Sequence, residues 1–290
     1  MLRNFKVLTP SSLNETLYVI NSLKEPYRFL CGGTDVLVRL KDNPNYTKVL
    51  VDISRLSELS KIEEHKSTYI IGATAKHLQV LAYEPFKKNY AAITDAVSVI
   101  GSPQIRALGT IGGNIGNASP AGDSIAALMA FDAEIETRSV DSNRKIMLSD
   151  FFLGPGKTVL APNEIITKII IPKFENYRSA WMRLGQRKGM AISKVSAAVS
   201  LHYEKHSNGS LKLNDIKIAL GSVAPRVIRA VKTEKFMLLK QTINKNMINE
   251  ATEMLLAEVS PITDVRSDEK YRRAMCGELF REIIEKLVLK

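Results

Sequence analysis

The sequence predicts a chain that mixes helices and strands, with a separate α+β unit at its C-terminal end. Three observations lead to this prediction. Helical and strand-like apolar patterns alternate up to residue 171. Pro172 and the polar residues 173–177 then form a boundary. Beyond it, strand-like runs over 195–203 and 216–223 precede two amphipathic helices, over about 244–258 and 268–288.

The elements of the first part follow from apolar spacing and end signals. Ser12 and Glu15 have the spacing of a capping box, and apolar residues recur at helical spacing from there to Leu23. Pro26 ends this helix. The other expected elements are strands over 27–31, 48–53, 69–73, 133–138 and 165–171, and helices from 36, around 78–82 and over 90–100.

The most unusual segment covers residues 101–123 and holds six glycines. It is too apolar to be a disordered linker. A long irregular segment inside a compact domain usually has a function, so we expect an irregular functional loop here. Asp123 is expected to cap a helix that reaches about Phe131.

Two glycine-rich loops carry the main chemical signal. They are Gly32-Gly33-Thr34-Asp35 and Thr110-Ile111-Gly112-Gly113-Asn114. Each offers clustered main-chain N–H groups without Cβ obstruction, which suits the close approach of a pyrophosphate. The two threonines add hydroxyl donors. The loops indicate a dinucleotide or phosphate ligand, although glycines also serve tight turns in proteins that bind neither.

The remaining sequence motifs do not support a P-loop, a Rossmann-type site, a catalytic nucleophile or a metal site. Gly154-Pro155-Gly156-Lys157-Thr158 resembles the end of a P-loop, but Phe151 stands where that motif requires its first glycine. No dinucleotide fingerprint of the Rossmann type, nucleophile elbow or zinc-protease motif occurs. Two cysteines, Cys31 and Cys276, cannot ligate an iron–sulfur cluster or a structural zinc ion. We therefore predict no metal site and no catalytic residue in this chain.

The charge is uneven. The net charge is +11; residues 1–175 hold 20 Lys and Arg against 18 Asp and Glu, and residues 176–290 hold 21 against 12. The basic C-terminal third can face an acidic partner or be a solvated surface. Nucleic-acid binding has little further support, because no aromatic-rich run accompanies the scattered cations. No spanning segment or signal-peptide pattern is visible, which favours a cytoplasmic protein.

At its glycine loops the sequence resembles the medium, FAD-binding subunits of molybdenum hydroxylases, such as xanthine, carbon monoxide and nicotinate dehydrogenases. The resemblance covers nearly the whole chain. It rests on Cys31-Gly32-Gly33-Thr34-Asp35, on the run from Gly101 to Arg106, and on Thr110 to Asn114 with its continuation to Asp123. The false P-loop also recurs in this family.

The resemblance implies an α+β fold of the vanillyl-alcohol-oxidase (PCMH) type. The FAD-binding domain would cover residues 1–175, with subdomains over about 1–56 and 57–175. A C-terminal α+β domain of the medium subunit would cover residues 176–290.

The resemblance also implies roles for single residues. The loop Leu30-Cys31-Gly32-Gly33-Thr34-Asp35-Val36 and the loop Thr110-Ile111-Gly112-Gly113-Asn114 would cradle the FAD pyrophosphate. Asp123 would bind the sugar or adenine end, Ile100 would lie near the flavin, and Ile166 would be an apolar contact. Arg183 stands where relatives often have lysine, which keeps the charge but changes its geometry. No histidine lies in either glycine loop, so FAD is expected to be non-covalent.

The implied function is electron transfer. A large partner subunit would oxidise substrate at a molybdenum cofactor, and a small one would carry electrons through [2Fe–2S] clusters. FAD on this chain would pass them to a final acceptor such as NAD, within a dimer of heterotrimers. Arg272 and Arg273 are candidates for docking a partner. Two alternatives remain: a free-standing flavin oxidoreductase of the same fold, and a non-enzymatic nucleotide-binding module.

Overall fold

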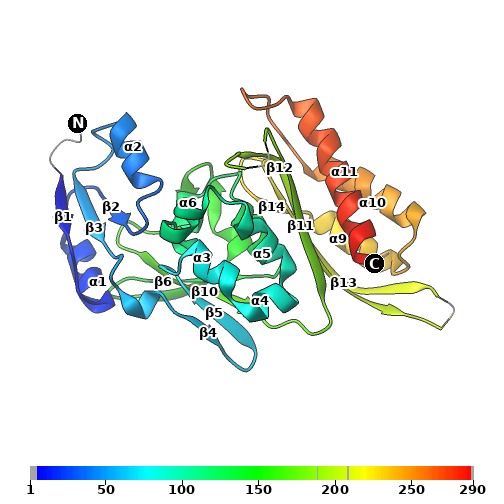
Figure 1. Ribbon diagram of the computed structural model, residues 1–290, viewed down its shortest axis with the longest axis horizontal. Coiled ribbons are helices and arrows are strands. Elements are labelled where there is room, and N and C mark those ends of the chain that lie inside the picture. Colours follow the sequence, from blue (N-terminus) through cyan, green and yellow to red (C-terminus); the bar gives the residue numbers. More distant parts are fainter. Residues whose placement is uncertain (1–4, 188, 208, 289–290) are drawn as a thin grey trace.

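Three regions, each with its own sheet, follow one another along the chain (Figure 1). This computed structural model describes residues 5–187, 189–207 and 209–288. The N-terminal region lies at one end and the helices α10 (Lys245–Glu258) and α11 (Glu269–Val288) at the other. No helix of the described ranges is both long and apolar enough to cross a membrane.

The N-terminal region is a small parallel sheet with two helices. Its strands have the order β1-β3-β2, and α1 buries Leu13, Leu17 and Ile20 against it. Ser12 caps α1, because its hydroxyl accepts from the Glu15 N–H at 3.1 Å. The Glu15 carboxylate accepts from the Ser11 N–H instead of the Ser12 N–H, so the predicted capping box is shifted by one residue. The elements are β1 (Lys6–Leu8), α1 (Leu13–Ser22), β2 (Tyr27–Leu30), α2 (Val36–Asp42) and β3 (Val49–Asp52).

The middle region is an antiparallel sheet covered by short helices. Its strand order is β4-β5-β10-β6-β7. The strands are β4 (Ile62–Glu64), β5 (Thr68–Gly72), β6 (Glu134–Arg138), β7 (Asn143–Met147) and β10 (Ile165–Pro172). The helices are α3 (His77–Ala82), α4 (Glu84–Asn89), α5 (Ala91–Ser98), α6 (Pro103–Leu108), α7 (Ile111–Asn117) and α8 (Asp123–Met129). Two 3-10 turns, η1 (Ser57–Leu59) and η2 (Leu148–Asp150), and a hairpin of β8 (Phe152–Gly154) and β9 (Lys157–Thr158) complete it.

The glycine-rich segment 101–123 is not irregular, and that expectation was wrong. It forms α6 and α7 because each helix has its own N-cap. The Ser102 hydroxyl accepts from the Ile105 N–H at 3.3 Å, and the Thr110 hydroxyl accepts from the Gly113 N–H at 3.1 Å. These side-chain bonds satisfy amides that a helix start otherwise leaves unpaired, which offsets the poor helix propensity of glycine.

One of two further helix predictions needs correction. The helix expected over 90–100 is present as α5, which covers Ala91–Ser98, and the helix α4 before it was not predicted. Asp123 does not cap α8; the N-cap is Gly122, and the Asp123 carboxylate bonds to Ser193 and Arg183 instead.

The C-terminal region is an antiparallel sheet that contacts the apolar core of the middle region on one face and the core under α10 and α11 on the other. Alternate residues of its central strands face opposite sides, as strand geometry requires. Trp181 and Ala198 join the core of the middle region, whereas Ala180 and Val199 pack toward α10 and α11. The sequence did not predict β11 or α9. The elements are β11 (Arg178–Gly185), β12 (Ser193–Lys205), β13 (Leu211–Gly221), β14 (Ile228–Arg229), α9 (Val231–Lys240), α10 and α11.

Three apolar clusters are centred one in each region, and the middle cluster also takes in Trp181 and Ala198 of the C-terminal region. The predicted domain boundaries stay a prediction. The apolar stripe of α11 is core at Leu279, Ile283 and Leu287, but Tyr271 at its start is 42% exposed.

Arg272 is not available for docking a partner. Its side chain is 2% exposed and donates to an Asp264 carboxylate oxygen at 2.6 Å and to the Ser222 carbonyl at 3.1 Å. It therefore holds the start of α11 to the loops beside it. Arg273 is partly exposed, bonds to the Leu256 carbonyl and lies 3.5 Å from the Glu269 carboxylate.

Candidate functional site

A cavity of about 1070 Å³ lies where the N-terminal and middle regions meet. Its walls come from the first glycine loop, from β2, from the glycine-rich helix α7 and from the segment that leads into β10. This volume is at the upper end for small-molecule and cofactor sites. A ligand in the cavity would contact residues from both regions.

Most of the predicted site residues line this cavity. Leu30 and Ile111 do not, and Ile111 is fully buried in the core of the middle region. Asp123 and Arg183 also lie outside the lining. The residues that do line it are Cys31, Gly32, Gly33, Thr34, Asp35, Val36, Ile100, Thr110, Gly112, Gly113, Asn114 and Ile166.

The first glycine loop presents main-chain donors to the cavity. The N–H groups of residues 32–35 have no hydrogen-bond acceptor among the described residues. Gly33 has φ +72°, in the left-handed region that favours glycine. Successive N–H groups around a left-handed residue form a concave nest that binds anions. The first loop therefore has the geometry expected for a phosphate contact.

The second glycine loop is built differently, and the expectation of free clustered amides was wrong for it. The Ile111 N–H donates to the Ala75 carbonyl at 3.0 Å, and the Gly112 N–H donates to the Ala73 carbonyl at 2.9 Å. The Gly113 N–H is taken by the Thr110 hydroxyl. Here glycine serves close packing, since a Cβ on Gly112 would lie 2.6 Å from the Ala73 carbonyl oxygen.

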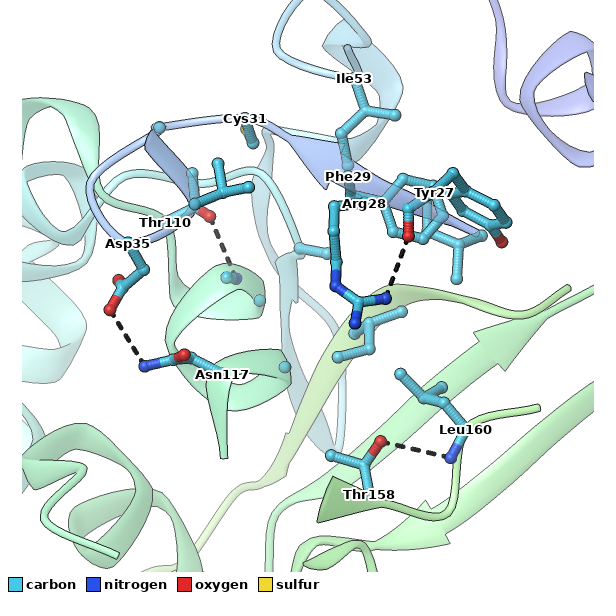
Figure 2. A pocket seen from close by; sticks show the side chains of 18 of the residues that line it. Tyr27, Arg28, Phe29, Cys31, Asp35, Ile53, Thr110, Asn117, Thr158 and Leu160 are labelled. Carbon is cyan, nitrogen blue, oxygen red and sulfur yellow. Dashed lines mark hydrogen bonds between the residues drawn. The ribbon is translucent and has the colours of Figure 1, made fainter. Parts of the chain in front are cut away.

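Side chains tie the two loops together. The Asn117 side-chain amide donates to an Asp35 carboxylate oxygen at 3.0 Å (Figure 2). Its oxygen accepts from the Arg39 guanidinium at 2.7 Å. On the second loop, the side-chain oxygen Oδ1 of Asn114 accepts from the Ser124 hydroxyl at 2.8 Å. The bonds of Asn117 fix the start of α2 against the end of α7. The side-chain nitrogen of Asn114, a residue of the cavity lining, has no acceptor among the described residues.

The opposite wall is aromatic and cationic. Tyr27 and Phe29 pack edge to face, with ring centroids 5.3 Å apart. Arg28 lies over the ring of Tyr46, 4.9 Å from its centroid. Figure 2 shows Tyr27, Arg28 and Phe29 on β2, across from Thr158 and Leu160. Flat apolar rings beside a cation suit the stacking of a planar heteroaromatic group.

Two titratable groups in the cavity wall, the Cys31 thiol and the His77 imidazole, are held neutral. Burial raises the pKa of the Cys31 thiol, and the Lys76 ammonium, 3.8 Å from its sulfur, offsets this only in part. Burial and the positive charge of Arg106 lower the pKa of His77 to about 4. At pH 7 neither group is a reactive thiolate or an effective general base.

Asp123 and Arg183 form a buried ion pair between the middle and C-terminal regions. Their side chains are 7% and 8% exposed, and the Arg183 guanidinium lies 3.0 Å from an Asp123 oxygen. The other Asp123 oxygen accepts from the Ser193 hydroxyl at 2.6 Å. Burial raises the pKa of Asp123 to about 6, against the opposite effects of Ser193 and Arg183.

This raised pKa predicts a pH-dependent stability. The folded protein binds the Asp123 proton more tightly than the unfolded chain, where the pKa is about 4. The carboxyl's contribution to the free energy of unfolding should therefore increase by about 3 kcal/mol as the pH falls from about 6 to about 4, and stay constant above that window. Urea unfolding of wild type and Asp123→Asn across this range checks it, and parallel pH profiles would contradict it.

Sequence reasoning missed several residues of the cavity wall. Asn117 lies only three residues beyond the second loop, so its polar side chain in that segment was a usable signal. Thr74 and His77 gave no signal, because only the tertiary fold brings them to the glycine loops.

Comparison with known proteins identifies the family. Residues 3–174 match the family model of the FAD binding domain in molybdopterin dehydrogenase. The chain belongs to this family. Residues 180–287 match the C-terminal domain of the CO dehydrogenase flavoprotein. The chain is thus an FAD-binding oxidoreductase subunit of the molybdenum hydroxylases, and the family predicted from the two loop signatures is confirmed.

Individual members of the family are similar over most of the chain. The nicotinate dehydrogenase FAD-subunit of Eubacterium barkeri is 34% identical over 205 residues, 69% of each chain. The glyceraldehyde dehydrogenase medium chain of Sulfolobus acidocaldarius is 29% identical over 287 residues, 99% of this chain and 96% of that one. A chain of carbon monoxide dehydrogenase from Hydrogenophaga pseudoflava superposes with a TM-score of 0.92 at 28% identity, covering 99% of this chain and 98% of that one. The predicted fold class is confirmed.

Proposed function

We propose that the cavity holds FAD, with the pyrophosphate on the first glycine loop. The unpaired N–H groups of residues 32–35 carry this proposal, because they are the donors that a pyrophosphate requires. Thr110 and Asn114 of the second loop add side-chain contacts, and Ile100 and Ile166 are apolar contacts. Asp123 and Arg183, outside the lining, are the predicted contacts that the cavity supports least.

We further propose that the chain transfers electrons within a larger complex. FAD, when bound, supplies chemistry that accepts electrons and hands them on. The chain's own residues bind and orient it, and the neutral state of Cys31 and His77 agrees with a site that performs no acid–base step. Electrons would arrive from [2Fe–2S] clusters on a small subunit, after substrate oxidation at a molybdenum cofactor on a large one. The final acceptor would be a molecule such as NAD.

The names of the relatives support the proposed partners. They include medium chains of carbon monoxide dehydrogenases and a xanthine dehydrogenase FAD-binding subunit from Escherichia coli. A medium chain implies larger and smaller companions, so we propose an assembly with both, as a dimer of heterotrimers. A free-standing flavin oxidoreductase would need a base in the cavity wall, and His77 with its lowered pKa does not provide one.

A flavin-retention experiment tests the cofactor site. The full chain is incubated with FAD, desalted and examined for the oxidised-flavin absorption band. Wild type should keep the band, and Gly33→Ala should lose most of it. A side chain at φ +72° strains the nest by about 1–2 kcal/mol, and its Cβ would lie 2.9 Å from the Leu37 side chain.

Gly209→Ala is the matched control. Gly209 has φ +83° but lies between β12 and β13, outside the cavity lining, with nothing within 4 Å of an added Cβ. The Gly209→Ala substitution introduces the same backbone strain, and the variant should retain flavin like wild type. Equal retention by Gly33→Ala and Gly209→Ala would contradict the placement of the pyrophosphate. If the wild-type chain held no flavin even in its assembled complex, the proposal that the cavity binds FAD would be contradicted.

A further inference from the structure

Two buried polar side chains in the cavity wall have no partner within the described part of the chain. They are Thr74, through its hydroxyl oxygen, and His77, through ring atom Nδ1. Each residue is 2% exposed, and both line the cavity. Buried polar atoms are almost always hydrogen-bonded, so two orphans on one wall need an explanation.

The main chain fixes both residues in place. The Thr74 N–H donates to the Leu59 carbonyl at 2.8 Å, and the His77 N–H donates to the Gly109 carbonyl at 3.0 Å. Between them, Lys76 forms an antiparallel bridge with Thr110. The segment 73–77 is therefore bound along the second glycine loop, which fixes the main-chain positions of Thr74 and His77 in the cavity wall.

His77 also lies beside the first loop. A Cβ built on Gly109 would be 3.2 Å from His77 Cδ2 and 3.5 Å from the Thr34 hydroxyl oxygen. The imidazole thus stands close to Thr34, one of the residues whose amide is unpaired. A ligand group bound by those amides would be within reach of both glycine loops and of the His77 ring.

We propose that Thr74 and His77 donate hydrogen bonds to the pyrophosphate of FAD, as a third contact beside the two glycine loops. The inference rests on the cofactor site proposed above. In the ligand-free protein the ring of His77 is uncharged at pH 7 because its pKa is lowered, and a neutral imidazole can donate one hydrogen bond, here from Nδ1–H. This contact replaces main-chain N–H donors of the second loop that are already bonded to the carbonyls of Ala73 and Ala75.

Binding and stability, measured together on the full chain or its purified complex, test this contact. Thr74→Val and His77→Leu should each weaken FAD binding about tenfold, as loss of one hydrogen bond to a charged group does. The melting temperature of the flavin-free chain should stay level or rise, because each change removes an unpaired buried atom. Thr74→Ser and His77→Asn keep a donor at the same place and should restore most of the affinity.

Ser196→Ala is the matched control. The Ser196 hydroxyl is also buried and unpaired among the described residues, but it lies on β12, outside the cavity lining. Its removal should leave the FAD dissociation constant within about twofold of wild type. The inference is overturned if Thr74→Val and His77→Leu also stay within that range, or if their donor-retaining counterparts bind no better. If wild type binds no FAD in the assembled complex, the cofactor site itself fails, which is a distinguishable result.

Discussion

Replacing Gly32 by alanine should separate the two glycine loops and abolish flavin retention. A Cβ at Gly32 would lie 2.2 Å from the Leu108 carbonyl oxygen and 2.9 Å from the Gly109 Cα. These are main-chain atoms, so no rotamer change relieves the overlap. Overpacking costs about 1–3 kcal/mol, and overlap with fixed main-chain atoms places this substitution at the upper end of that range. Urea unfolding and FAD titration of the variant measure both effects.

Gly154→Ala is the control for this prediction. Gly154 lies in β8 with nothing within 4 Å of an added Cβ and no positive φ. It should change the free energy of unfolding by less than about 0.5 kcal/mol and leave flavin retention intact. If Gly32→Ala behaved like Gly154→Ala, the loops would not be in the close contact described here.

Replacing Arg183 by methionine should destabilise the protein by about 3–5 kcal/mol at pH 7, because it leaves the buried Asp123 carboxylate without its cation. It also frees the Ala191 and Val99 carbonyls, which accept from Arg183 at 3.0 and 3.3 Å. Arg183→Lys should lose less, since it keeps the charge but not the several directed donors. Denaturant unfolding at pH 7 gives both values.

The exposed pair of Lys240 and Glu250 is the control for charge removal. Its side chains are 52% and 54% exposed, and the charged atoms lie 3.4 Å apart. Lys240→Met should cost less than about 0.5 kcal/mol. A similarly small loss in Arg183→Met would show that Asp123 is neutral or solvated at pH 7, against the buried geometry described here.

Local signals gave much of the fold. Ser12 marked the start of α1, and apolar runs gave β3, β5 and β10. Two of the failures had different causes, one local and one tertiary. The segment 101–123 became helical through caps at Ser102 and Thr110, which glycine content conceals. The strand β11 was missed because its eight residues include two arginines and a serine that find partners only in the folded protein.

The cavity lies at the two glycine loops that the sequence singled out, but the sequence did not show which loop has free main-chain N–H groups. Glycine clustering and the family resemblance pointed to both loops. Only the structure showed that the main-chain N–H groups of residues 111 and 112 donate to the carbonyls of Ala75 and Ala73. Those of residues 32–35 have no acceptor among the described residues. Thr74 and His77 lie at positions whose importance depends on a bridge between Lys76 and Thr110, and no sequence pattern encodes that bridge.

The position of the cavity has a consequence for cooperativity. One wall belongs to the parallel sheet of the N-terminal region and the other to helices of the middle region. A ligand that touches both adds its binding free energy to the docking of one region on the other. We therefore expect the two regions to separate more readily in the flavin-free chain, and FAD binding to make them open and unfold together.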